Sequence, residues 1–195
     1  MERVLFLDLD GPVWPDRVTK FHPDNTMDNH NFQLIISEME KNGDTFAACM
    51  MTYWRMDEVA VGMLNRLMDI QPFYTVVSST WREFCSKDTI QMLFDENDLN
   101  LQLHQHWMTP LAATFRGDFV NKDMLRLLEI KRWLANHSDT VSHYAVLDDP
   151  SSGGVLVDDS HVRGVGLDPN AVVLVDPFIG MEIFHFDQLR KLLTI

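Results

Sequence analysis

Residues 1–14 read MERVLFLDLDGPVW, and in this stretch an apolar run leads directly into two carboxylates. The run at 4–7 is too short for a helix and is stopped by a glycine-proline turn signal, so it indicates a buried strand. Asp8 and Asp10 stand two residues apart at the end of this strand, which places their side chains on the same side of a sheet. Like charges held this close repel each other, so the pair costs stability unless a cation or a proton relieves it.

Three further apolar runs end in polar clusters and are predicted to be strands. They lie at 73–77 before Ser78-Ser79-Thr80, at 144–147 before Asp148-Asp149, and at 171–175 before Asp176-Pro177. Helical periodicity predicts helices at about 56–70, 122–136 and 183–193. Strands that alternate with helices and read as continuous apolar runs indicate an α/β fold with a doubly wound parallel sheet. In such sheets ligands bind at the carboxyl ends of the strands, where the polar clusters fall.

The length of 195 residues suits a single domain over 1–195 that can bury a substantial core. Residues 15–50 differ from the rest because they are polar and rich in Asp, Asn and His, and we expect an insertion or small cap there. Residues 150–170 are rich in Gly, Ser and Asp and are predicted to form a loop, with one short strand at 155–157.

The chain carries a formal net charge of −13 and no cluster of Lys or Arg that could follow a polyanion. The overall field would therefore oppose tight binding of long nucleic acid. Cys49 and Cys85 show no metal-binding spacing and are interpreted as reduced thiols, so we expect a cytoplasmic protein. The charged N-terminus and the lack of a long apolar run predict neither a signal peptide nor a membrane span.

The residue types at the predicted strand ends suit phosphoryl chemistry. Three carboxylates can hold Mg²⁺ through one or two direct contacts, with waters and a substrate phosphate completing the shell. One aspartate can attack phosphorus and form an aspartyl-phosphate, and a carboxylate two residues further on can serve as general acid and base. Hydroxyl and cationic side chains can neutralise charge on the phosphoryl oxygens.

The segments LFLDLDGPVW, VVSSTWR, LEIKRWL and YAVLDDP, in that order, resemble the four motifs of the haloacid dehalogenase (HAD) superfamily of phosphohydrolases. The closer resemblance is to the small HAD domains of the Swiss Army Knife RNA-repair type. Their characteristic residues match Leu64-Asn65, the SSxWR run at 78–82, the EIxxWL run at 129–134 and the VDPxxG run at 175–180. The resemblance covers most of the chain outside 15–50 and 150–170, and it implies a Rossmann-like HAD fold with a small cap or none.

Matched position by position, the resemblance implies a role for each polar residue at the strand ends. Asp8 becomes the nucleophile and a Mg²⁺ ligand, and Asp10 becomes the general acid and base that also binds the metal through its backbone carbonyl. Ser79 is favoured over the neighbouring hydroxyls for holding the phosphoryl group. Asp148 completes the metal site, with Asp149 beside it.

Two of these assignments stay open. The third motif expects a cation, which is either Arg126, three residues before Glu129, or Lys122, one helical turn earlier on the same face. The acidic motif could also be the pair Asp158-Asp159, which ends a second apolar run, although the spacing from helix to strand favours Asp148.

The sequence therefore predicts a Mg²⁺-dependent phosphomonoesterase that acts on a nucleotide or another small phosphorylated metabolite. The alternatives are a HAD-like module that only binds a phosphorylated ligand, a phosphotransferase, and a phosphatase that acts on nucleic-acid ends. Outside the motifs, Trp81 is interpreted as a packing residue and Arg82 as half of a structural ion pair. His104 and His106 are expected at the surface.

Overall fold

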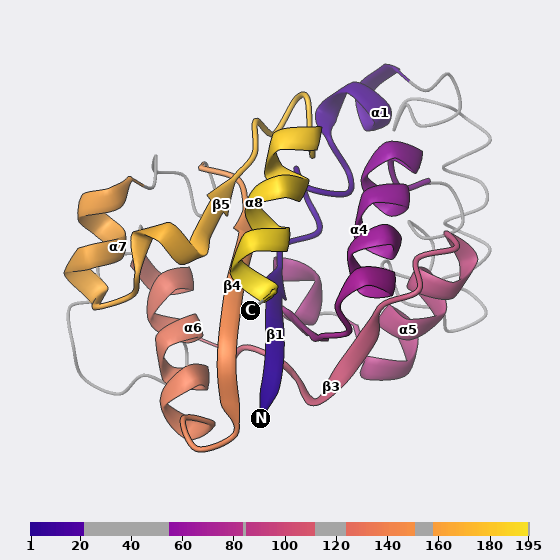
Figure 1. Ribbon diagram of the computed structural model, residues 1–195. Coiled ribbons are helices and arrows are strands. Elements are labelled where there is room, and N and C mark those ends of the chain that lie inside the picture. The colour runs from indigo at the N-terminus through magenta and orange to yellow at the C-terminus, as the bar shows by residue number, and fades with distance from the viewer. Residues whose placement is uncertain (22–54, 84, 112–123, 151–157, 195) are drawn as a thin grey trace.

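The computed structural model describes residues 1–21, 55–83, 85–111, 124–150 and 158–194, and these contain a five-stranded sheet. The strands are β1 (Glu2–Leu7), β2 (Tyr74–Val77), β3 (Gln102–Met108), β4 (Val141–Asp148) and β5 (Val172–Leu174). All neighbouring strands pair in parallel, in the order β3-β2-β1-β4-β5, so β1 lies at the centre (Figure 1). The predicted doubly wound parallel sheet is confirmed.

Helices cover both faces of the sheet. They are α1 (Asp16–Phe21), α4 (Glu58–Ile70), α5 (Lys87–Glu96), α6 (Leu125–Asn136), α7 (Asp159–Val165) and α8 (Ile183–Leu193), with short 3₁₀ turns η1 (Thr80–Glu83) and η4 (Pro169–Ala171). Leu5 and Leu7 of β1 pack into a core formed with α4, α5 and α8, whereas Val4 and Phe6 pack against α6 and α7. Figure 1 shows α4 and α8 side by side in front of the sheet. Each of these four β1 side chains is fully buried, which stabilises the fold by roughly 1.5–3 kcal/mol apiece.

The carboxyl ends of the three central strands lie level with one another. Leu7 of β1 is in register with the last apolar residues of β2 and β4. The pairing continues one step further, since the N–H of Asp8 donates to β4 and the N–H of Ser78 donates to Leu7 O, each at 2.9 Å. Asp8, Ser78 and Asp148 therefore emerge at one edge of the sheet.

Most predicted elements are present, with shifted boundaries. The strand expected at 144–147 begins earlier, at Val141, and the last helix has the predicted bounds. The strand expected at 155–157 lies outside the described residues. The expected insertion at 15–50 is described only in its first part, which contains the helix α1. Among the helices of the described ranges, none is both long and apolar enough to cross a membrane.

The sequence analysis did not predict β3. His104, which was expected at the surface, lies in this strand and is buried. The pairing of β3 with β2 shifts register after Leu103, so the burial pattern does not alternate and both Leu103 and His104 are buried. The expectation that His104 lies at the surface is therefore wrong, because its side chain packs against Tyr74 and Trp133. Burial lowers the pKa of His104. His106 is exposed, as expected.

Candidate functional site

Three buried aspartates converge where β1 and β4 end. Asp8, Asp148 and Asp149 each offer a carboxylate oxygen, and these oxygens all lie within 4.8 Å of one another. We call these three side chains the carboxylate cluster. The N–H of Leu9 donates to Asp8 Oδ1 at 2.8 Å, and the N–H of Asp149 donates to Asp148 Oδ1 at 2.9 Å. The backbone of the following residue therefore orients each of the two strand-end carboxylates.

Gly11 lets the loop after β1 pass directly beside the cluster. Its φ is +84°, and a Cβ at this position would lie 3.0 Å from Asp149 Cβ and 3.2 Å from Asp149 Oδ2. The N–H of Gly11 donates to Trp14 O at 3.1 Å, which closes the turn. A side chain here would strain the backbone and press on Asp149, so the glycine of the DxDG run has a steric reason.

The first turn of α6 brings a cation to the cluster. Arg126 Nη1 lies 3.2 Å from Asp8 Oδ1, and the arginine side chain is largely buried. Of the two candidates for the third motif, the structure places Arg126 against Asp8, while Lys122 lies outside the described residues. One guanidinium faces three carboxylates, so these four side chains carry excess negative charge when all are ionised.

Burial and neighbouring charge shift the pKa values of Asp148 and Asp10. Burial, together with the charge of Asp8, holds the pKa of Asp148 well above its usual range. Burial and the charge of Asp8 also raise the pKa of Asp10 to about 6. A hard divalent cation such as Mg²⁺ binds carboxylate oxygens and removes the repulsion between them. The cluster therefore fits a magnesium ion, both in its donor atoms and in its unrelieved charge.

The carboxyl group of Asp10 is held by an indole rather than by the cluster. Trp81 Nε1 lies 3.1 Å from both Oδ1 and Oδ2 of Asp10. The Trp81 ring also packs on Trp14, with ring centroids 5.0 Å apart. The packing role expected for Trp81 is confirmed, but the sequence did not predict its polar contact. The only signal was its place in the SSTWR run directly after a strand.

The two serines after β2 are both fully buried. Ser79 Oγ accepts a long hydrogen bond of 3.4 Å from the N–H of Trp81. Ser78 Oγ has no hydrogen-bond partner among the described residues. Thr80, the next hydroxyl along, is exposed. Buried hydroxyls need partners, so Ser78 and Ser79 are better suited than Thr80 to hold a phosphoryl oxygen.

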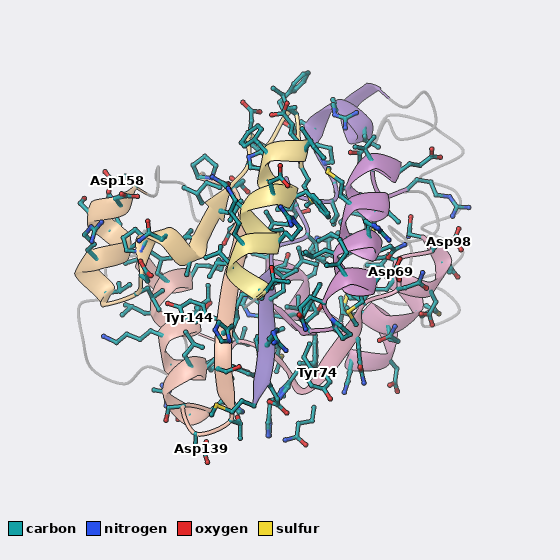
Figure 2. The ribbon with its side chains drawn as sticks, in the orientation of Figure 1. Asp69, Tyr74, Asp98, Asp139, Tyr144 and Asp158 are labelled. Atoms are coloured by element: carbon teal, nitrogen blue, oxygen red, sulfur yellow. The ribbon has the colours of Figure 1, made fainter. Side chains whose placement is uncertain are left out.

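The second acidic pair lies away from the cluster. Asp158 is the N-cap of α7, where its carboxylate accepts from the N–H groups of Ser160 and His161. Its side chain is 63% exposed, and Figure 2 shows it on α7 at the outer edge of the molecule. Hydrogen bonds, first of all from the Ser160 hydroxyl, lower the pKa of Asp158 to about 2. Of the two pairs left open by the sequence, Asp148-Asp149 is the one that meets Asp8.

A buried ion pair joins the loop after β2 to α6. Arg82 Nη2 pairs with Glu129 Oε2, and both side chains are almost wholly buried. Arg82 Nη1 also donates to Ser79 O. The structural ion pair predicted for Arg82 is confirmed, although its partner was not predicted. Glu129 lies three residues after Arg126 on the same face of α6, so a single helix contacts both the cluster and the serine loop.

A cavity of about 380 Å³ lies between the start of α4 and the end of α5. Arg55, Asn65 and Asp98 are among its lining residues, and none of the three aspartates of the cluster lines it. The cavity is therefore separate from the candidate site.

One comparison with known protein families finds a match, and this family is consistent with the α/β fold. A family model described as the HAD domain in Swiss Army Knife RNA repair proteins matches residues 4–182. The match includes all five strand ends, the carboxylate cluster and Arg126. No curated protein and no solved structure matches the chain. A HAD domain of this kind indicates chemistry of the phosphohydrolase type. Since the match spans most of the chain, the protein belongs to the HAD domains of Swiss Army Knife RNA repair proteins.

Proposed function

We propose that this HAD domain is a Mg²⁺-dependent phosphomonoesterase that works through an aspartyl-phosphate on Asp8. The observation that carries the proposal is the buried carboxylate cluster with Arg126 against Asp8. A module that only bound a phosphorylated ligand would need neither a nucleophile nor an acid. Both are present in Asp8 and Asp10, which favours the enzyme over the binding module.

In this proposal the cluster is the metal site. Asp8, Asp148 and Asp149 would hold Mg²⁺ through their carboxylates, and Asp10 would contribute its backbone carbonyl. When bound, the ion neutralises charge on the phosphate and aligns it with the nucleophile.

In the first half of the reaction a carboxylate oxygen of Asp8 attacks phosphorus. The bond from phosphorus to the ester oxygen breaks, and its electron pair stays on that oxygen. Asp10 gives its proton to the same oxygen, so the leaving group departs as a neutral alcohol. Burial, the largest cause of the raised pKa of Asp10, favours the protonated form that this step needs. Arg126 and Ser79 bind the other phosphoryl oxygens and offset their charge.

In the second half Asp10 is a carboxylate and acts as the base. It takes a proton from water while the water oxygen bonds to phosphorus. The bond between phosphorus and Asp8 breaks, and its electrons return to the Asp8 carboxylate. Inorganic phosphate leaves, and both aspartates are back in their starting states.

We propose a nucleotide or another small phosphorylated metabolite as the substrate, in a cytoplasmic setting. The net charge of −13 supports this choice, because a long polyanion would meet an opposing field. A single phosphoryl group needs only the metal and one guanidinium, which the site can supply.

The test is release of inorganic phosphate from an aryl phosphate, with Mg²⁺ and after addition of EDTA. We expect activity that depends on Mg²⁺ and that Asp8→Asn abolishes, because an amide neither attacks phosphorus nor binds Mg²⁺ well. Asp158→Asn is the control and should keep wild-type activity, since that side chain caps α7 at the surface. A wild-type protein that binds phosphate esters but releases no phosphate would favour the binding module instead.

A further inference from the structure

We propose that Trp81 is a positioning residue, whose indole N–H holds the carboxyl group of Asp10 in the orientation that proton transfer requires. The inference rests on the acid–base role proposed above for Asp10. It adds a residue that the DxDG run does not contain, on a different element of the fold, the 3₁₀ turn η1 that follows β2.

The first support is the geometry of the contact. Trp81 Nε1 is equidistant, at 3.1 Å, from the two carboxyl oxygens of Asp10. A donor at equal distances from the two oxygens lies in front of the carboxyl group, in the plane that bisects the two oxygens. The contact therefore fixes the direction in which the Asp10 carboxyl group points.

The second support is the chemistry of the donor. An indole N–H can donate a hydrogen bond but cannot accept one. Trp81 therefore cannot take the proton that Asp10 has to deliver, whereas a histidine or a serine at this position could accept it. The indole orients the acid and leaves the substrate oxygen as the acceptor.

The third support is that the indole is itself held in place. The Trp14 and Trp81 rings pack at a centroid distance of 5.0 Å, and Trp14 is buried. Trp14 belongs to the same turn as Asp10, because the two residues form an isolated β-bridge and Gly11 donates to Trp14 O. The turn that carries the acid thus also carries the ring that supports its hydrogen-bond donor.

The kinetic test compares Trp81→Phe with wild type on two esters that differ in leaving group. A nitrophenyl phosphate needs little help from an acid, whereas an alkyl phosphate must be protonated as it leaves. For Trp81→Phe we expect kcat/KM for the alkyl phosphate to fall by about tenfold or more, within the range that general acid catalysis contributes, and kcat/KM for the nitrophenyl phosphate to change little. Equal losses for the two esters would overturn the inference.

Trp133→Phe is the matched control. Trp133 Nε1 also donates a hydrogen bond, to His106 O at 2.9 Å, but this buried ring lies in the core on the α6 side of the sheet. Its replacement removes an indole donor and core packing together. If destabilisation alone produced the leaving-group effect, Trp133→Phe would show that effect too, and the inference would fall.

A readout that needs no turnover is the ¹H–¹⁵N resonance of the Trp81 indole, assigned by its loss in Trp81→Phe. Asp10→Ala should move this resonance upfield and leave that of Trp133 in place, because only the Trp81 indole loses its acceptor. An unmoved Trp81 resonance would overturn the inference even in an active enzyme. Failure of wild type to hydrolyse either ester, with the resonance shift present, would instead overturn the proposed function and with it the catalytic part of the inference.

Discussion

Asp148 and Asp158 both follow an apolar run of the sequence, yet their surroundings shift their pKa in opposite directions. Asp148 is buried beside Asp8, and its pKa is raised by burial and by that neighbouring charge. Asp158 is exposed, and hydrogen bonds from Ser160 and His161 lower its pKa. A bound cation would relieve the repulsion between Asp148 and Asp8, whereas the carboxylate of Asp158 already caps the helix α7.

The two aspartates are therefore expected to respond differently to replacement. Asp148→Ala should raise the Mg²⁺ concentration needed for half-maximal activity by about 10- to 100-fold or more. Metal affinity falls by this factor even when only a residue that hydrogen-bonds to a metal ligand is replaced. Asp158→Ala should leave that concentration unchanged, since the residue caps α7. Titration of activity against Mg²⁺ for both variants checks this. The reverse order would move the acidic motif to Asp158.

Cys85 is expected to react slowly with iodoacetamide in the native protein. Burial raises the pKa of its thiol from 9.0 to about 11, and the thiolate is the reactive form. At pH 9 the folded protein would then hold about a hundredth of this thiol as thiolate, against about half in the unfolded chain. Mass spectrometry of the Cys85 peptide, with and without denaturant, measures the two rates. Equal rates would contradict the burial of this side chain.

Residues of the site were predictable where the chemistry is local in sequence. Asp8 and Asp10 stand directly after an apolar run, and their place at a strand end follows from that run alone. The partners Glu129 and Trp81 were not predictable in the same way, because their contacts depend on how α6 and η1 approach the sheet. These contacts join residues far apart in the chain, so the local sequence pattern does not indicate them.

At the scale of elements, β1, β2 and β4 were predicted because they are buried on both faces and read as continuous apolar runs. The helices α5 and α7 and the strand β3 were missed. The helix α5 does carry local signals, an N-cap at Ser86 and three buried apolar residues at helical spacing, so the sequence could have predicted it. β3 is an edge strand with polar residues and a register shift, and α7 spans seven residues, too few for a helical period to stand out. Tertiary packing rather than local periodicity decides β3 and α7.

The attachment of η1 to α6 can be tested by breaking the ion pair between Arg82 and Glu129. Arg82→Met would remove the Arg82 guanidinium from the buried Glu129 carboxylate, which is expected to lower the free energy of unfolding by about 3–5 kcal/mol. The double variant Arg82→Met/Glu129→Leu should recover much of this loss, because it also removes the buried carboxylate that Arg82 had paired with.

The matched control for this experiment is the exposed pair of Arg190 and Asp187 on α8, 3.6 Å apart. Arg190→Met should change the free energy of unfolding by less than about 1 kcal/mol, as is usual for surface pairs. Denaturant unfolding curves give all three values. A double variant that is no more stable than Arg82→Met would show that the pair is not the link between the two elements.

At the scale of the whole molecule, 29 acidic residues against 16 basic ones set the field around the site. A protein that follows a nucleic acid gains affinity by releasing counterions, and it does so with clusters of Lys and Arg. The family match names RNA repair proteins, whereas the charge of this chain favours a small substrate. The proposed small substrate therefore has to be compared with a nucleic-acid end by experiment.

We expect faster phosphate release from a mononucleotide than from an oligonucleotide that ends in the same nucleotide. Binding of the oligonucleotide through several phosphates would show as a log affinity that falls by roughly 0.7–0.9 units per phosphate contact for each tenfold rise in salt. Specific activities on both substrates, at low and moderate salt, make the comparison. Faster and salt-sensitive release from the oligonucleotide would reveal a basic groove and contradict the small-substrate proposal.

Trapping of the phosphorylated protein tests whether phosphoryl transfer passes through Asp8. An aryl phosphate labelled with ³²P is mixed with Asp10→Asn protein and Mg²⁺ and quenched in acid. This variant should still be phosphorylated, because the aryl group leaves without an acid, but it lacks the base that activates water. We expect label on the Asp8 peptide that hydroxylamine removes, as it does from an acyl phosphate, and no label on the double variant Asp8→Asn/Asp10→Asn. Label that persists in the double variant, or that maps to another residue, would contradict transfer through Asp8.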